Sequence, residues 1–518
     1  MNSYAAPEPV EGRIPNHTKE EHMTRSYADW QAAAAALEFD GRPVIGGARV
    51  DARSGLTIEK TNPATGELIS RIHACDETDV DAAVAAAREA FESGTWSRAG
   101  AGFRRERLLE FARLIEQRAD EFALYDSLDM GKPVRESSTI DAPGSAALYR
   151  FYAEAIEKQE DLIPVTPPGS TALVTREPLG VVAVIVAWNY PLEIATWKLA
   201  PALAAGNTVV VKPPVEASHS TLLLAELAIE AGIPVGVLNV VTGRGSTVGR
   251  ALGTHEDVDM LAFTGSTEVA KQLQQYAGQS NMKRLALEAG GKSSNLIFAD
   301  CDDLRLAAEK AAFGSFYNQG EVCSANSRIF VEREVYEEFV RLYAEAAKAY
   351  APGDPLDPET GIGALVSEAH ADTVWATIEN ARRDGTIRAG GTRPEIGGSR
   401  AFIEPTIVTD VPADHEVHTR EIFGPVAVVT PFDTEEEAIA RANETPYGLA
   451  ASLWTGSLAR AHRVSQRLVA GTVSVNTVDA LGFTTPFGGF KQSGFGRDLS
   501  VHALENYTDY KTTWMQWG

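Results

Sequence analysis

The sequence predicts an α/β protein built on parallel β-sheets, and three observations support this prediction. Short β-branched or apolar runs alternate with helical stretches through the middle of the chain, and the helical stretches often begin at Gly, Ser or Thr. Strands that are buried on both faces and linked by helices are typical of a parallel sheet. The chain has 518 residues, more than one compact core normally holds, so we expect two or more domains.

A helical layer and a first sheet are expected in the first half of the chain. From about residue 77 to residue 125 apolar residues recur at helical spacing, with Asp76 and Thr78 as candidate caps. Two further helices are expected at Ser218–Glu230 and Thr267–Tyr276. The strands expected in this part are Val181–Ala187, Thr208–Lys212, Val237–Val241 and Met260–Phe263.

A second α/β segment is expected from about residue 291 to residue 475. The stretch 351–400 is rich in Gly, Pro and charged residues, which predicts surface loops and one helix. The strands expected in this segment are Ser294–Phe298, Ser327–Val331, Val426–Pro431, Ala450–Trp454 and Val473–Asn476.

Composition and charge exclude several classes of partner. The net charge is −24, which disfavours binding to nucleic acid or to anionic membranes, because both are polyanions. The longest apolar run, Val181–Trp188, is far shorter than the roughly 20 residues of a membrane helix. The first 20 residues contain no apolar segment resembling a signal peptide. We expect a cytoplasmic protein with no nucleic-acid or membrane partner.

The cysteines are few and scattered. Cys75, Cys301 and Cys323 form neither a disulfide framework nor a thiolate metal site, so we expect a reducing compartment and no metal. Cys323 ends the segment Asn318-Gln-Gly-Glu-Val-Cys, in which Gly320 gives the backbone freedom just before the thiol. The structural alternative for a single cysteine is a buried, inert side chain.

Three strand-to-helix turns carry candidate nucleotide-binding residues. Glycines in the segment from Gly243 to Gly249 let the backbone approach a pyrophosphate at a helix start; the spacing GxGxxxG leaves an ordinary Gly-rich turn equally open. In Phe263-Thr-Gly-Ser-Thr267, Gly265 and Ser266 can face a phosphate or nicotinamide, or Ser266 can simply cap the helix. Lys212 ends a strand, where a lysine reaches a ribose or phosphate, or stays solvated.

Further motifs complete a family pattern. Glu288-Ala-Gly-Gly-Lys292 places a carboxylate before two glycines, and Glu421-Ile-Phe-Gly-Pro425 is a turn with an acid and an aromatic at its start. Together with Trp188-Asn-Tyr-Pro191 and Thr485-Pro-Phe-Gly-Gly-Phe-Lys-Gln-Ser-Gly494, and in this order, these motifs resemble the aldehyde dehydrogenase superfamily from about residue 40 to residue 518.

The resemblance implies a Rossmann-like parallel-sheet cofactor domain, an α/β catalytic domain and a small oligomerisation arm. The implied boundaries are a flexible tail at 1–25, an NAD(P)-binding domain at 26–155 and 179–290, a catalytic domain at 291–490, and an oligomerisation segment at 156–178 and 491–518. Because an extended arm leaves an open sheet edge that pairs across subunits, we expect a homodimer or homotetramer.

The resemblance also implies a mechanism in which an aldehyde becomes a carboxylate. Cys323 is the nucleophile, and its thiol pKa must fall below about 8.5 for it to react at neutral pH. The Asn189 amide and the Cys323 N–H stabilise the oxyanion of the thiohemiacetal. Hydride passes to the nicotinamide, and Glu288 is the base that activates water to hydrolyse the thioester. Lys198 tunes the environment of the cysteine.

The implied cofactor is NAD or NADP. Lys212 is expected to hold the adenosine ribose and Glu421 the nicotinamide ribose. NAD-preferring relatives carry a glutamate where this chain has Val215, with Glu216 one position later, and this departure leaves the choice of cofactor open. The full set of expected cofactor contacts is Val186, Trp188, Lys212, Gly243, Gly249, Phe263, Gly265, Ser266, Glu421 and Phe423.

The C-terminal block Phe483–Asp498 and its continuation to Trp514 look most like bacterial γ-glutamyl-γ-aminobutyraldehyde dehydrogenases of putrescine breakdown. The expected substrate contacts are Asp141, Tyr190, Glu193, Trp197 and Asp479. An acid such as Asp141 or Asp479 attracts an amine, or else caps a loop. If Glu193 faces the channel it favours a cationic or hydroxylated substrate; otherwise it is a favourable charge at a helix start.

Four other functions stay open at this point. A broad-specificity aliphatic or aromatic aldehyde dehydrogenase has the same motifs. A CoA-acylating dehydrogenase shares the fold and the cysteine but generally lacks the hydrolytic glutamate, so Glu288 counts against it. A non-catalytic scaffold is disfavoured because Cys323, Glu288 and Asn189 occur together. Oxidation of γ-glutamyl semialdehyde in a proline pathway is the fourth.

Overall fold

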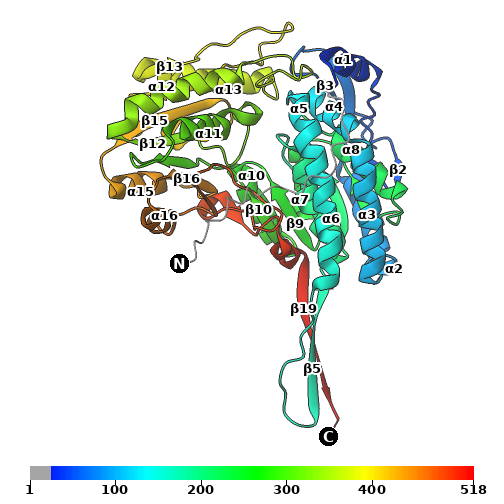
Figure 1. Cartoon of the computed structure of the whole chain (residues 1–518). Coiled ribbons are helices and arrows are strands. Elements are labelled where there is room, and N and C mark those ends of the chain that lie inside the picture. The colour runs from blue at the N-terminus through cyan, green and yellow to red at the C-terminus, as the bar shows by residue number, and fades with distance from the viewer. Residues whose placement is uncertain (1–24, 518) are drawn as a thin grey trace, which may run out of the picture.

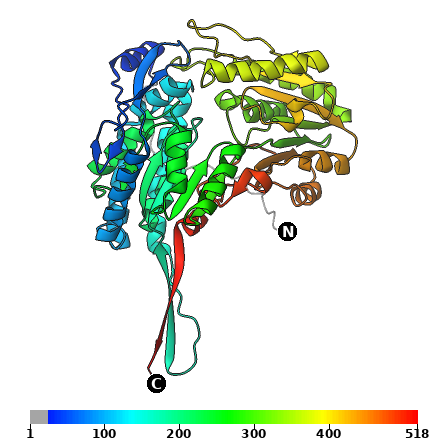
Figure 2. The ribbon, with the colours of Figure 1, turned by 180° about the vertical axis from the view of Figure 1, so that it is seen from behind.

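Two large sheets covered by helices, and a two-stranded arm that projects from them, make up the computed structural model. The structure describes residues 25–517, so the flexible tail expected at 1–25 lies outside the described residues except for Arg25. Figures 1 and 2 show the sheets side by side, with the arm extending away from both. The predicted α/β class is confirmed.

The first sheet has eight strands in the order β18-β10-β9-β6-β7-β8-β1-β2, and its five central strands are parallel. The parallel strands are β6 (Val181–Ile185), β7 (Thr208–Lys212), β8 (Leu238–Val240), β9 (Met260–Thr264) and β10 (Arg284–Glu288). The antiparallel edges are β1 (Val44–Ile45), β2 (Ala48–Arg49) and β18 (Gly494–Phe495). All four strands expected here are present, and β10, which ends on Glu288, was not predicted.

Both faces of this sheet are buried because successive side chains alternate between two cores. Val182 and Val184 of β6 belong to one core, whereas Val181, Ala183 and Ile185 belong to the other. Asp76 caps α2 with its side chain, as the sequence predicted. The main covering helices are α2 (Glu77–Ser93), α3 (Ala101–Gln117), α4 (Ala119–Met130), α6 (Ala142–Ala155), α7 (Pro191–Ala205), α8 (His219–Glu230) and α10 (Thr267–Gln279).

The second sheet has seven strands in the order β13-β14-β15-β12-β11-β16-β17. Its strands are β11 (Ser294–Ile297), β12 (Arg328–Glu332), β13 (Thr386–Ala389), β14 (Thr406–Thr409), β15 (Val426–Phe432), β16 (Ala450–Trp454) and β17 (Thr472–Val475). The helices packed around it are α11 (Leu304–Phe316), α12 (Tyr336–Ala346), α13 (Glu368–Asp384), α15 (Glu435–Asn443) and α16 (Leu458–Ser465). The expected helix within 351–400 is α13, but the same stretch also contains the edge strand β13.

The smaller elements within the described residues are a β-hairpin, four short helices and several single helical turns. A hairpin of β3 (Thr57–Thr61) and β4 (Leu68–His73) lies outside the large sheets. The remaining helices are α1 (Tyr27–Ala36), α5 (Val134–Glu136), α9 (Arg250–Thr254) and α14 (Glu416–Thr419). The described turns of other helical type that matter below are η1 (Ser137–Asp141), η3 (Gly245–Gly249), η4 (Tyr317–Gly320) and η8 (Val501–Tyr507).

The arm consists of β5 (Ser170–Pro178) paired antiparallel with β19 (Thr508–Gln516) along its whole length. Tyr510, Trp514 and Met515 of β19 are exposed. The earlier part of the segment expected to oligomerise, 491–507, lies elsewhere: it contributes β18 to the first sheet and packs η8 against α7. Across residues 25–517, no helix combines the length and apolarity needed to cross a bilayer.

Candidate active site

A cavity of about 240 Å³ contains both Cys323 and Glu288. Glu288 is the last residue of β10, and Cys323 follows η4 at the entrance to the second sheet. Thr264, at the end of β9, lies in the same wall. The aromatic side chains that line the cavity are Tyr190, Trp197, Phe313, Tyr317 and Phe487. Edges of the two sheets thus bring the predicted nucleophile and the predicted base together.

The loop before Cys323 is held by the Trp-Asn-Tyr-Pro turn. Asn318 and Gln319 have positive φ angles of 47° and 57°, a conformation that is uncommon outside glycine. The Asn318 side chain donates to the backbone carbonyl of Asn189 (2.9 Å), and the Asn189 side chain donates to the carbonyl of Glu321 (2.8 Å). Asn189 is buried. These reciprocal amide bonds place the Asn189 amide two residues from the thiol-bearing residue.

Gly290 and Gly291 allow three chain segments to meet. A Cβ atom at Gly291 would lie 2.2 Å from the Cys323 carbonyl oxygen, and one at Gly290 would lie 2.2 Å from Glu421 Oε2. The Gly291 N–H donates to Glu421 Oε1 at 3.0 Å. Any side chain at these positions would push the cysteine or Glu421 away, which explains why two glycines follow Glu288.

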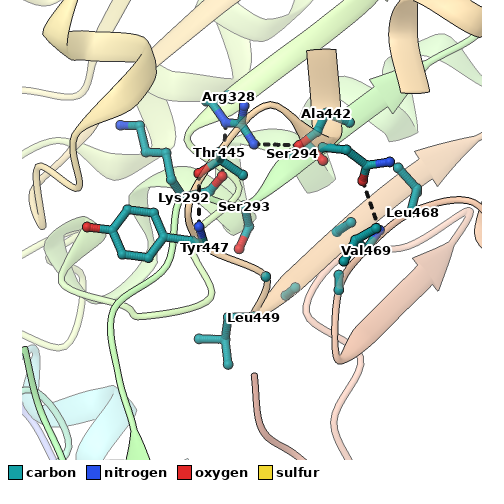
Figure 3. Close-up of a pocket in the computed structure, with 15 residues that line it drawn as sticks. Lys292, Ser293, Ser294, Arg328, Ala442, Thr445, Tyr447, Leu449, Leu468 and Val469 are labelled. Carbon is teal, nitrogen blue, oxygen red and sulfur yellow. Dashed lines mark hydrogen bonds between the residues drawn. The ribbon is translucent and has the colours of Figure 1, made fainter. Parts of the chain in front are cut away.

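A small cavity of about 10 Å³ lies behind this turn, and Figure 3 shows its lining. Arg328 donates from Nε to the Lys292 carbonyl (2.9 Å) and from Nη2 to the Ala442 carbonyl (2.8 Å). Lys292 is buried, and burial lowers its pKa to about 7. The arginine therefore anchors the segment that carries Gly290 and Gly291 to the second domain.

The charged groups around Cys323 are carboxylates. Burial, and then the negative charges of Glu288, Asp479 and Glu421, raise the pKa of the Cys323 thiol well above its ordinary value. Burial also raises the pKa of Glu288, which lines the same cavity, to about 8. These surroundings act against the low thiol pKa that the reaction needs at neutral pH, because they contain anions rather than cations.

Lys198 acts on the surroundings of the cysteine through Glu288. Its buried ammonium is bound to the buried carboxylate of Asp498. Its charge opposes the burial effect and lowers the pKa of Glu288. Glu288 is in turn the charged group that shifts the Cys323 pKa most.

Several predicted cofactor residues gather at the carboxyl ends of β6 and β7. The Val186 N–H donates to the Lys212 carbonyl (3.4 Å), and Lys212 Nζ donates to the Pro213 carbonyl (2.8 Å). A Cβ atom at Gly249 would lie 4.0 Å from Lys212 Cδ, so η3 passes directly beside this lysine. Gly243, with φ of 133°, allows the turn from β8 into η3.

The turn after β9 lies between the strand ends that carry the predicted cofactor residues and the cavity that contains Cys323. The Ser266 side chain accepts from the Val269 N–H (3.3 Å), so Ser266 is the N-cap of α10. The Gly265 N–H donates to the Glu288 carbonyl (3.2 Å). A Cβ atom at Gly265 would lie 2.6 Å from the Phe263 ring. Helix capping explains Ser266, and close packing against Phe263 explains Gly265; both residues also lie at the helix start where a nucleotide would bind.

Glu421 and Phe423 face the Trp188 turn from the second domain. The rings of Trp188 and Phe423 meet edge-on with centroids 5.2 Å apart. His370 of α13, which the sequence did not single out, lies beside both rings, and its Nε2 is 2.6 Å from the Phe423 carbonyl oxygen. Burial raises the pKa of Glu421 to about 7, opposed by its bond to the Gly291 N–H. The position of His370 beside these two rings could not be predicted from the sequence, because a single histidine in a helix has no recognisable motif.

Four of the five expected substrate contacts line the Cys323 cavity: Tyr190, Glu193, Trp197 and Asp479. Asp479 accepts from the Ser324 hydroxyl at 2.7 Å, next to the cysteine. Glu193 faces this cavity, and burial followed by the charge of Asp141 raises its pKa to about 8.

Asp141 does not line the cavity; its neighbour Ile140 does. The Asp141 carboxylate is fully buried and pairs with the buried ammonium of Lys132 at 2.5 Å. Lys132 lies 3.7 Å from the centre of the Tyr190 ring. The structure therefore does not place Asp141 among the residues that line the cavity: its charge is paired with Lys132, which in turn contacts the Tyr190 ring.

The parallel sheet has Gly-containing turns at the carboxyl ends of its strands, as nucleotide-binding sheets do, and it faces a cavity lined by a cysteine and a glutamate. This combination is typical of an oxidoreductase that uses a thiol and a nicotinamide cofactor. The chain belongs to the aldehyde dehydrogenase family, whose model matches residues 50–513. It is an NAD(P)-dependent enzyme that acts on an aldehyde, as the sequence predicted.

Three relatives illustrate the similarity. NADP/NAD-dependent aldehyde dehydrogenase PuuC of Escherichia coli (strain K12) is 47% identical, over 94% of this chain and 98% of that protein. The structure of γ-glutamyl-γ-aminobutyraldehyde dehydrogenase from Burkholderia cenocepacia J2315 is 47% identical, covers 95% of this chain and 100% of that one, and has a TM-score of 0.93. P. syringae AldA indole-3-acetaldehyde dehydrogenase, in complex with NAD⁺ and IAA, is 48% identical with the same coverage and a TM-score of 0.94. The resemblance to γ-glutamyl-γ-aminobutyraldehyde dehydrogenases is confirmed.

Proposed function

We propose that this enzyme oxidises an amine-derived aldehyde such as γ-glutamyl-γ-aminobutyraldehyde. The observation that carries the proposal is that Glu193 and Asp479 line the same cavity as Cys323. Two carboxylates in an aromatic chamber attract the ammonium group of a simple aminoaldehyde, through charge and through the faces of the rings. They accept a hydrogen bond from the amide N–H of γ-glutamyl-γ-aminobutyraldehyde, whose ammonium lies at the far end of its glutamyl group. Bound substrate cations also favour the ionised form of Glu193, whose pKa is raised in the free enzyme.

In the proposed mechanism, Cys323 attacks the aldehyde carbon while its proton moves to the Glu288 carboxylate. Both groups line the same cavity, and Glu288 is the carboxylate that acts most strongly on the Cys323 thiol, so it is the base proposed for that proton. Of the two amide hydrogens of Asn189, one is donated to Glu321, so the other is available to the developing oxyanion, together with the Cys323 N–H. After oxidation leaves a thioester on Cys323, Glu288 passes the thiol proton to solvent. Its carboxylate then takes a proton from the water that attacks the thioester, which releases the carboxylic acid product and the Cys323 thiolate.

The described residues fit a nicotinamide dinucleotide. Buried Lys212, with its ammonium bonded to a carbonyl, lies at the C-terminal end of β7 and would hold the adenosine ribose. Glu421, which accepts from the Gly291 N–H, would hold the nicotinamide ribose. Burial lowers the pKa of Lys212 to about 8. When bound, the nicotinamide supplies the hydride acceptor. The other proposed contacts are Val186, Trp188, Gly243, Gly249, Phe263, Gly265, Ser266 and Phe423.

The substrate proposal is tested by turnover of γ-glutamyl-γ-aminobutyraldehyde, 3-aminopropionaldehyde and propionaldehyde by the wild type and the Asp479→Asn and Glu193→Gln variants. We expect the variants to lose about tenfold in kcat/KM for the amine-derived aldehydes and little for propionaldehyde. The matched control is Asp81→Asn, an exposed carboxylate on α2. Equal losses for all three aldehydes would contradict the proposal.

The aromatic lining supports a second candidate, a broad-specificity enzyme for aromatic or aliphatic aldehydes. Indole-3-acetaldehyde discriminates the two. Faster turnover of this aldehyde than of the amine-derived ones would favour the second candidate. The glutamate beside the cysteine favours hydrolysis over acyl transfer to CoA in either case.

We also propose that the arm of β5 and β19 joins subunits into a homodimer or homotetramer in the cytoplasm. The outer edge of β19 and the exposed side chains of Tyr510, Trp514 and Met515 support an interface between copies of the chain. Light scattering at micromolar concentration tests the proposal, with a chain ending at residue 507 as the variant. A monomeric full-length enzyme would contradict it.

A further inference from the structure

A second cavity, of about 460 Å³, lies next to Lys212, at the carboxyl ends of the parallel strands of the first sheet. Its walls come from four distant parts of the chain: the strand β3, the end of β7 with the turn after it, the start of η3, and Val366 with Ser367 before α13. Lys212 and Val215 line it from the β7 side, and Gly245 and Ser246 line it from η3. The adenosine half of a dinucleotide bound at the ends of β6 and β7 reaches this cavity.

Lys60 of β3 is the unusual residue in the wall. Its side chain is only 6% exposed. Its ammonium donates to the carbonyl of Thr61. Over residues 25–517, Lys60 forms no ion pair, although Asp129 and Glu216 act on it at longer range. A buried ammonium without a paired anion is unfavourable, so an anionic ligand in the cavity would stabilise Lys60.

Arg244 adds a second cation to the same wall. It precedes η3 and is exposed, and within the described part of the chain it has neither an ion pair nor a side-chain hydrogen bond. Of the two acids in the lining, Glu59 bonds to Arg71 outside the cavity, and Glu216 is exposed. Three cations, Lys60, Lys212 and Arg244, therefore face one acid without a partner of its own.

Val215, in the same wall, is uncharged and has no hydrogen-bonding side chain. A ribose diol needs a carboxylate acceptor at this edge, whereas a ribose phosphate needs an arginine or lysine. Val215 offers no acceptor and no negative charge to repel a phosphate. We propose that Lys60 and Arg244 bind the 2′-phosphate of NADP⁺, and that these two residues select NADP⁺ over NAD⁺.

The direct test is isothermal titration of the full-length enzyme with 2′-AMP and with 5′-AMP, because only the former places a phosphate at the selective position. We expect the wild type to bind 2′-AMP more tightly than 5′-AMP. We expect Lys60→Gln and Arg244→Gln each to weaken 2′-AMP binding about tenfold or more, and 5′-AMP binding far less. The matched control, Arg250→Gln, removes an exposed arginine of α9 that does not line the cavity, and should leave both affinities unchanged.

Kinetics give the second readout. In each of the two variants, kcat/KM for NADP⁺ relative to NAD⁺ should fall about tenfold with the same aldehyde. Glu216→Gln should raise this ratio, because it removes the unpaired acid of the wall. Thermal unfolding checks that the buried Lys60→Gln variant is folded, and the exposed Arg244→Gln variant tests the proposal independently. Wild-type enzyme that binds 2′-AMP no better than 5′-AMP, or an equal loss for both cofactors, would overturn it.

Discussion

The pH dependence of turnover follows from the pKa of Glu288. Burial raises this pKa to about 8, so about a tenth of the Glu288 side chains are ionised at pH 7 and about nine tenths at pH 9. Only the ionised carboxylate can take the thiol proton or activate water. We therefore expect kcat/KM of the wild type to rise about tenfold between pH 7 and pH 9.

The Glu288→Gln variant tests whether this rise comes from Glu288. The amide keeps the size of the side chain but cannot accept the proton, so we expect kcat/KM to fall by about 10²–10⁴ and the rise near pH 8 to disappear. Initial rates of nicotinamide reduction, measured at constant ionic strength from pH 6 to pH 10, give both profiles. A variant that retains the wild-type profile would refute the reasoning, as would a wild-type rate that is flat across this range.

Three further predictions concern single residues. Asn189→Ala should lower kcat about 10²–10³-fold in single-turnover measurements, because one oxyanion donor is lost. Gly291→Ala should abolish turnover and lower the melting temperature, because its Cβ would lie 2.2 Å from the Cys323 carbonyl oxygen; a fully active variant would contradict the packing argument. Burial raises the pKa of Glu136 to about 8 in the folded state, so its contribution is intact below its unfolded pKa near 4.5 and is lost as the pH rises through about 8, at about 1.4 kcal/mol for each unit. Glu136→Gln should therefore raise the melting temperature more at pH 8 than at pH 5, and an equal change at both would contradict it.

The sequence predicted the interior of the fold well. Thr208–Lys212 and Ala450–Trp454 match β7 and β16, because continuous β-branched or apolar runs in buried parallel strands give an unmistakable pattern. The edge strand β13 and its neighbour β14 were missed; β13 is half exposed and lies in a Gly-rich stretch where charge hides its alternation. β10 was missed because its first residues are polar or exposed.

The sequence predicted which motifs form the site, but it did not predict all the contacts that their side chains make. The resemblance to aldehyde dehydrogenases predicted that Cys323, Glu288 and Asn189 act together, but the groups that shift their pKa values or pair with their neighbours come from remote segments. Lys132, nine residues before Asp141, neutralises that acid, and Asp498 lies 300 residues from Lys198. Such long-range pairs leave no periodic signal in a single sequence, so the roles expected for Asp141 and Lys198 could not be checked before the fold was known.

The central claim is that the reaction passes through a thioester on Cys323. Intact-protein mass spectrometry of the Glu288→Gln variant, mixed with aldehyde and NAD⁺ or NADP⁺ and quenched in acid, tests it most directly. Because solvent can still take the thiol proton slowly, whereas thioester hydrolysis lacks its base, we expect one acyl group to accumulate on each chain. We expect peptide mapping to place it on Cys323, and the Cys323→Ala, Glu288→Gln double variant to carry none. Turnover by Cys323→Ala, or an acyl group on Cys75 or Cys301 instead, would contradict the claim.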